Sequence, residues 1–123
     1  MIKNYLHIIF LLAFSYAELI TPSNGDNINF VYVLFEWEQE PDALEYNLQV
    51  SNQSSFNNIL VDINEESTVY IEKDHLDWES TYFWRVRPIY GNGNFGEWLD
   101  VSDFSIDEKQ FPERDANIYN EDL

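Results

Sequence analysis

The stretch Thr81-Tyr82-Phe83-Trp84-Arg85-Val86-Arg87-Pro88 decides the fold of this 123-residue chain. Within it, Tyr82, Trp84 and Val86 are apolar and occupy every second position. A period of two is typical of a β-strand with one face in the core and the other in water. We therefore expect a central strand whose inward face, with two aromatic rings, starts a small core.

The residues before this strand predict the edge of a β-sandwich. Leu76 precedes Tyr82 across the polar turn Asp77-Trp78-Glu79-Ser80-Thr81. This arrangement is typical of a tyrosine corner, in which the Tyr hydroxyl bonds to the backbone a few residues upstream. We expect Tyr82 to make that bond.

The same alternation recurs on both sides of the central strand, and no segment after the N-terminus has a helical period. Turn-forming residues separate the alternating segments. The other expected strands are residues 19–22, 30–38, 44–51, 59–63, 68–72 and 104–106. Their expected inward residues include Val33, Phe35, Trp37, Tyr46, Leu48 and Val50. Seven short strands without helices predict an all-β, antiparallel sandwich.

Residues 1–17 have the composition of a secretory signal peptide. Lys3 is followed by the apolar run Leu6–Phe14, and small residues stand at Ser15 and Ala17. The run is shorter than the ~20 apolar residues that a membrane span needs, so we expect no stable membrane insertion after cleavage. An uncleaved anchor is the alternative interpretation.

The C-terminal residues 108–123 are acidic and polar, and we expect a tail or a linker there. The sandwich would then occupy residues 18–107. Together with a signal peptide, this organisation predicts a secreted, periplasmic or cell-surface protein, or the N-terminal part of a larger surface protein.

The charge of the chain is strongly negative. Six Lys and Arg residues stand against 23 Asp and Glu, which gives a net charge of −17 at pH 7. Such a surface repels phosphate backbones and anionic lipids, so we expect no nucleic-acid partner. The sequence has no cysteine, which excludes disulfides and thiolate metal sites.

An ordered set of residues runs through the middle of the chain. It consists of Pro22, Trp37, Ala43, Tyr46-x-Leu48-x-Val50, Phe56, Leu76, Tyr82-x-Trp84-Arg85-Val86-Arg87, Gly96-Glu97-Trp98 and Phe104. With this set, residues 18–107 resemble a fibronectin type III domain of the kind found in bacterial exported proteins.

The resemblance implies an immunoglobulin-like sandwich of seven strands. The strands around Leu19, Phe35 and Tyr70 would form one sheet. The second sheet would contain the strands around Tyr46, Ile59, Trp84 and Phe104.

The inventory of reactive side chains does not support catalysis. After the signal peptide, the only histidine is His75, in the acidic turn Asp74-His75-Leu76-Asp77, where capping or solvation is the simpler interpretation. We therefore expect no enzyme and no cofactor.

Calcium binding is an alternative hypothesis. The segments 23–27 and 62–66 carry oxygen ligands in turns, but Asx-turn chemistry explains both without a metal.

Carbohydrate binding is a second alternative, because Trp78, Tyr90, Phe95 and Trp98 lie in or near loops. Exposed rings would stack on sugars, whereas rings that fold back as lids on the sandwich would be buried.

The first hypothesis is a non-catalytic exported module that serves as a spacer or contacts a partner protein or a neighbouring domain. Loops at the ends of a sandwich and outward strand faces are where such a fold places recognition. We also expect an outward cross-strand pair between Glu45 and Arg87. The expected interaction surface comprises Phe83, Arg85, Arg87, Tyr90, Asn92, Asn94, Phe95 and Trp98.

Overall fold

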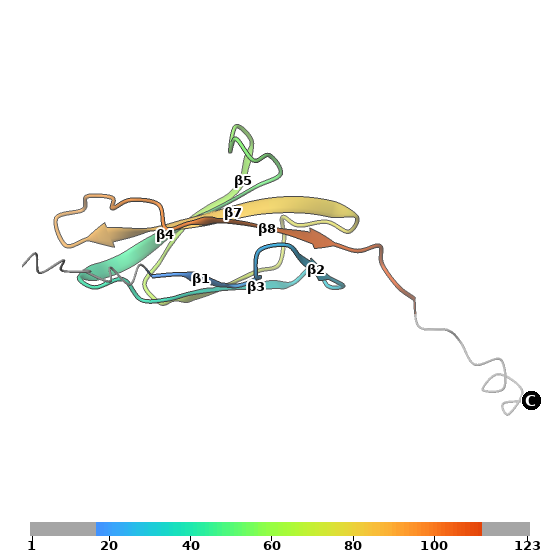
Figure 1. Cartoon of the computed structure of the whole chain (residues 1–123), viewed down its shortest axis with the longest axis horizontal. Coiled ribbons are helices and arrows are strands. Elements are labelled where there is room, and N and C mark those ends of the chain that lie inside the picture. The colour runs from blue at the N-terminus through green and yellow to red at the C-terminus, as the bar shows by residue number, and fades with distance from the viewer. Residues whose placement is uncertain (1–16, 112–123) are drawn as a thin grey trace, which may run out of the picture.

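A computed structural model gives the structure of residues 17–111, which fold into two β-sheets packed face to face (Figure 1). The three-stranded sheet has the order β1-β3-β6, and the five-stranded sheet has the order β2-β8-β7-β4-β5. The expected all-β sandwich and the division of its strands between two sheets are confirmed. The strands are β1 (Leu19–Thr21), β2 (Asp26–Ile28), β3 (Val33–Trp37), β4 (Ala43–Ser51), β5 (Ile59–Glu65), β6 (Val69–Glu72), β7 (Ser80–Tyr90) and β8 (Val101–Ile106).

Strand β2 is an addition to the seven predicted strands, and its pairing is parallel. Asp26 lies opposite Phe104 and Ile28 opposite Ile106 of β8. The segment is only three residues long and has turn-like composition, so the sequence showed no alternation there. Between β1 and β2 the chain crosses from one sheet to the other, and the indole N–H of Trp84 donates a hydrogen bond to the Pro22 carbonyl at 3.3 Å.

The core lies between the inward faces of β3, β4 and β7, as the alternation predicted. The ring of Phe35 meets those of Trp84 and Phe104 edge-on, with centroids 5.1 and 5.8 Å apart. Such tilted contacts are favourable arrangements of aromatic rings. All nine expected core residues are buried: Val33, Phe35, Trp37, Tyr46, Leu48, Val50, Tyr82, Trp84 and Val86.

The tyrosine corner is also confirmed. The hydroxyl oxygen of Tyr82 accepts a hydrogen bond from the backbone N–H of Asp77 at 2.8 Å, and Leu76 is buried beside it. This bond fixes the crossing between the sheets at the start of β7.

The predicted signal peptide lies outside the described residues except for Ala17, and so does the predicted tail beyond residue 111. Between residues 17 and 111, no helix is long and apolar enough to cross a membrane.

Candidate functional site

The residues of the expected interaction surface fall into two groups. Phe83, Arg85 and Arg87 point outward from β7, and each is half-buried. The others follow on the same strand and in the connection to β8, residues 91–100, which lies at one end of the sandwich (Figure 1). In that connection Asn92 and Asn94 are exposed. The half-exposed Tyr90, the exposed Phe95 and the half-buried Trp98 complete the set.

Two arginines and three aromatic rings form an alternating stack, which we call the ladder. The guanidinium carbon of Arg85 lies 4.0 Å from the ring centroids of both Phe56 and Trp98. The guanidinium carbon of Arg87 lies 4.2 Å from the Trp98 centroid and 3.6 Å from that of Phe95. Each contact is a cation–π interaction, worth ~0.5–1 kcal/mol when exposed and more when water is excluded. The ladder therefore attaches the loop after β7 to the sheet.

The spacing on β7 explains why Trp98 enters the ladder. Side chains two residues apart on a strand point the same way and are separated by roughly 6.7 Å, which leaves room for one flat ring between them. The Trp98 ring thus lies between the guanidinium groups of Arg85 and Arg87. Both faces of this ring are occupied.

Buried amides from β4 hold the two guanidinium groups in place. Arg85 donates from Nε and Nη2 to the Gln49 side-chain oxygen at 3.1 and 2.8 Å. Arg87 donates from Nε to the Asn47 side-chain oxygen at 3.0 Å. The amide nitrogens of Asn47 and Gln49 donate in turn to the Asp62 carboxylate at 2.7 and 3.2 Å. Burial lowers the pKa of Arg85, as does the neighbouring charge of Arg87, while Asp62 opposes this shift.

The expected ion pair between Glu45 and Arg87 is wrong. In the observed register Asn47 lies opposite Arg87, and Glu45 lies opposite Ile89, two pairs further along β7. The only ion pair within residues 17–111 joins His75 and Glu72. Strands β4 and β7 are not consecutive, so no turn between them fixed their register in the sequence.

The loop after β7 is closed by local hydrogen bonds. Tyr90 N–H donates to the Asn94 carbonyl at 3.0 Å, and Gly93, at φ 81°, donates to the Tyr90 carbonyl at 2.8 Å. The Asn92 side chain accepts from the backbone N–H of Asn94 at 3.0 Å. With the ladder holding Phe95, this loop is pre-organised although its tip is exposed.

These contacts bear on the hypotheses of carbohydrate binding and calcium binding. With both faces of Trp98 covered, that ring cannot serve as a sugar platform, and Arg87 covers one face of Phe95. In the first turn proposed for calcium, the Asp26 carboxylate accepts a hydrogen bond from Ser23 N–H, three residues earlier, at 2.8 Å and so has a local partner in the turn. Between residues 17 and 111, no three His, Asp or Glu side chains are grouped so that they could hold a metal ion.

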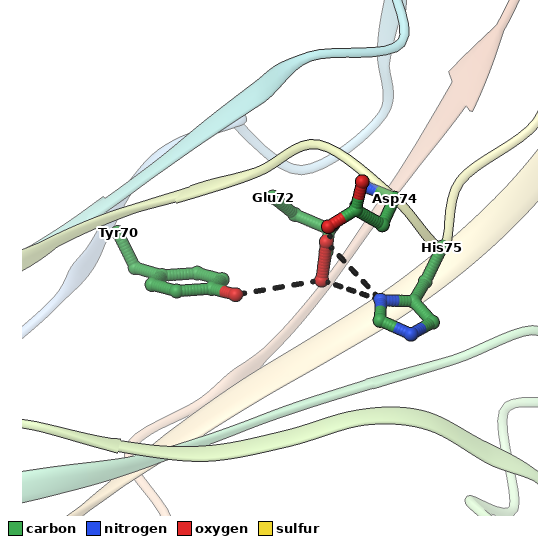
Figure 2. Close-up of polar contacts among 4 residues, drawn as sticks. All are labelled: Tyr70, Glu72, Asp74 and His75. Atoms are coloured by element: carbon green, nitrogen blue, oxygen red, sulfur yellow. Dashed lines mark hydrogen bonds and ion pairs between the residues drawn. The ribbon is translucent and has the colours of Figure 1, made fainter.

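A buried carboxylate on β6 was not anticipated from the sequence. The Glu72 side chain is 3% exposed and lies between Tyr70 and His75 (Figure 2). It accepts hydrogen bonds from the backbone N–H of Asp74 at 3.1 Å and from Tyr70 at 3.5 Å, and His75 Nδ1 lies 3.0 Å away. Burial alone would raise the pKa of Glu72, but the Asp74 N–H and then His75 outweigh it, so the pKa is lowered. The Tyr70 pKa is raised by burial and by Glu72.

Strand β6 has a reversed polarity: a charged residue, Glu72, points toward the core, and aliphatic residues point toward solvent. Tyr70 and Glu72 face β3 residues that point into the core, so Val69 and Ile71 point outward and are 42% and 51% exposed. Leu34 lies directly opposite Ile71, and Ile20 of β1 is also exposed on this sheet. We call these four aliphatic residues the apolar sheet face: Ile20, Leu34, Val69 and Ile71.

The comparisons with known proteins concern the fold. No family model matches the sequence, and no curated protein matches it. A fibronectin type III-like protein from Clostridium thermocellum superimposes with a TM-score of 0.55 and 17% identity, over 71% of this chain and 91% of that one. The fold is that of a fibronectin type III domain.

A second solved structure supports the same assignment. The fibronectin type III domain of human fibronectin type III domain containing protein 3 gives a TM-score of 0.58 at 15% identity. The match covers 82% of this chain and 93% of the human domain. The expected resemblance to a fibronectin type III domain is therefore confirmed at the level of the fold, and the function has to be argued from this chain's own surfaces.

Proposed function

We propose that this chain is a non-catalytic, exported fibronectin type III module that contacts another protein. The contact is either with a separate partner or with a neighbouring domain, and the apolar sheet face is its main surface. The observation that supports the proposal is the reversed polarity of β6, which buries Glu72 and exposes Val69 and Ile71.

The reversal is unfavourable for an isolated domain. A carboxylate costs free energy when it is removed from water, and exposed aliphatic side chains lose their hydrophobic contribution. Here the hydrogen bonds to Glu72 offset the cost of burying its carboxylate, but the cost of exposing the aliphatic side chains remains. A protein partner that covers Leu34 and Ile71 would recover it, because clustered exposed aliphatic residues mark protein contacts.

The loop after β7 is a second recognition surface in this proposal. The ladder uses Arg85, Arg87 and Trp98 to hold the loop, which leaves Asn92, Asn94 and Phe95 to be presented. Phe95 is 53% exposed although its ring is fixed over Arg87. A rigid aromatic side chain at a loop tip loses little entropy when a partner binds.

Site-specific photo-cross-linking tests the proposal. A benzoyl-phenylalanine is placed at position 71, at position 95, or at the exposed control position 79, and the purified protein is mixed with an envelope extract of the source cells. We expect a saturable cross-link from position 71, and none from position 79. If position 71 reacts no more than position 79, the chain is a spacer and the proposed contact is wrong.

Competition distinguishes a specific contact from adhesion. Unlabelled protein should abolish the cross-link, whereas the Ile71→Asp variant should not. Ile59→Asp is the matched control, since Ile59 is a 39% exposed isoleucine on the other sheet, and it should compete like the parent. A melting-temperature screen with calcium, EDTA and polysaccharides tests the alternatives, because a saturable rise with one of these ligands would replace protein contact by ligand binding.

A further inference from the structure

A cleft of about 660 Å³ opens beside β1 and is lined in part by residues of the loop after β7. Its volume is in the range of ligand pockets, ~300–1,000 Å³. The apolar part of the lining comes from both sheets and consists of Ala17, Leu19, Pro88, Tyr90, Trp98 and Leu99. The cleft is separate from the apolar sheet face, which lies on the outer side of β1, β3 and β6.

Four carboxylates line the same cleft: Glu18, Glu40, Glu97 and Asp100. Within residues 17–111 none of them has an ion-pair partner, and no Lys, Arg or His is among the lining residues. Arg85 and Arg87 reach the cleft only through the lining residue Trp98, on which both guanidinium groups stack, and Gln49 and Asn47 hold them on the outer face of the sheet. The cleft therefore combines apolar walls with four carboxylates and no lining cation, and a concave surface of this kind concentrates cations.

The spread of these carboxylates indicates the size of the cation. They come from three separate segments of the chain, since Glu97 and Asp100 share the connection after β7, and between residues 17 and 111 no three acidic side chains converge on one ion position. A bare divalent ion needs several oxygen ligands at 2.0–2.6 Å, roughly. An organic cation on an apolar body fits the arrangement better.

One open strand edge borders the cleft. Within residues 17–111, strand β1 pairs only with β3, so its second edge carries no strand near Leu19. The edge of β8 is occupied at this level, because Asp103 N–H donates to the Asn24 side-chain oxygen at 2.9 Å and the Asp103 carbonyl accepts from Gly25 N–H at 2.9 Å. Leu19 and Ser102 both line the cleft. Open edges accept an extended peptide by backbone hydrogen bonding, with alternate side chains directed to either side.

We propose that this cleft binds an extended segment of a partner protein in which Lys or Arg alternates with apolar residues. The apolar side chains pack against Leu19, Tyr90 and Leu99, and the cationic groups meet Glu18 and Glu97 at the opening. The backbone of the segment pairs with the open edge of β1. This site does not depend on the apolar sheet face, so either proposal can fail while the other stands.

Fluorescence anisotropy with a labelled peptide of alternating Leu and Lys tests the site. The double variant Glu18→Gln/Glu97→Gln should weaken binding about tenfold, because it removes two charges at the opening. Glu79→Gln/Glu108→Gln is the matched control: it removes the same net charge from exposed side chains at the other end of β7 and β8. The control should bind within about twofold of the parent, and all three proteins should share one melting temperature.

Three results would overturn the proposal. Equal weakening in both double variants would mean attraction to the overall negative charge. Equal affinity for a peptide with Gln in place of Lys would remove the cationic requirement. Displacement of the peptide by spermine at the peptide's own concentration would show that a free amine is enough. Amide chemical-shift changes should concentrate at Leu19, Leu99 and Ser102 and not at Ile71, which separates this cleft from the apolar sheet face.

Discussion

The hydroxyl oxygen of Tyr82 lies 2.8 Å from the backbone nitrogen of Asp77 and accepts its hydrogen bond. Tyr82→Phe keeps the buried ring but leaves the Asp77 N–H without this partner. We expect a loss of about 1 kcal/mol in the free energy of unfolding, measured by urea denaturation. Tyr32→Phe is the control, since Tyr32 is 64% exposed, and it should unfold like the parent. Equal stability of the two variants would contradict the role of the corner.

The alternation of apolar and polar residues in the sequence correctly predicted the core residues of the long strands. In β3, β4 and β7 the nine residues predicted to point inward are all buried. The sequence predicted a strand at residues 68–72 but not which of its side chains point inward, and its apolar Val69 and Ile71 point outward. The deciding contacts are the hydrogen bonds to Glu72 from residues that follow the strand, and alternation within the strand carries no information about them.

The interaction surface was predicted only as a set of residues. The sequence placed Arg85 and Arg87 outward, and this is where they lie. It did not show that Trp98 folds back between them, because that contact depends on the path of the loop. The sequence did contain a signal for this contact. Arg85 and Arg87 stand two residues apart on one strand, and a tryptophan, Trp98, follows in the next loop.

Arg87→Lys should destabilise the protein although it keeps the charge. A lysine cannot stack flat between Trp98 and Phe95, and it lacks the Nε donor that bonds to the buried Asn47 oxygen. We expect a loss of about 1–3 kcal/mol in urea unfolding. Lys73→Arg, at an exposed site, is the reciprocal control and should change little. A fully stable Arg87→Lys variant would mean that charge alone holds the loop.

Gly96 is required by close packing rather than by its backbone angle. A Cβ at this position would lie 2.6 Å from Pro88 Cγ and 2.9 Å from Tyr90 Cε2. Gly96→Ala should therefore displace the loop from β7 and cost about 1–3 kcal/mol, seen as a lower melting temperature. Gly91→Ala is the matched control, because its Cβ would meet only Leu44, at an ordinary 3.5 Å. Indistinguishable melting of the two variants would show that the loop yields freely.

The stability of the domain should depend on the charge of Glu72. Its pKa is below the usual value of 4.5, so the folded state binds this proton less readily than the unfolded chain does. The stabilisation is therefore present above pH 4.5 and is lost as the pH falls through the lower, folded pKa. The stability difference between the parent and Glu72→Gln should narrow on acidification from pH 7 to pH 3. The Asp74 N–H lowers the pKa of Glu72 independently of His75, so part of this dependence should persist in His75→Ala. A difference that is constant with pH would contradict an ionised Glu72.

The two core tryptophans provide the last comparison. Trp37 and Trp84 are 1% and 0% exposed, so replacement by Phe removes similar apolar area from both sites. Their indole nitrogens differ. Trp84 donates to the Pro22 carbonyl, whereas Trp37 Nε1 is buried and has no hydrogen-bond partner within residues 17–111. Trp84→Phe leaves a carbonyl unpaired, while Trp37→Phe removes a donor that was already unpaired. We therefore expect Trp84→Phe to cost about 1–3 kcal/mol more than Trp37→Phe in urea unfolding. If the two variants lose the same free energy of unfolding, or Trp37→Phe loses more, packing contributes more than the hydrogen bond between Trp84 and the Pro22 carbonyl, where the chain crosses between the sheets.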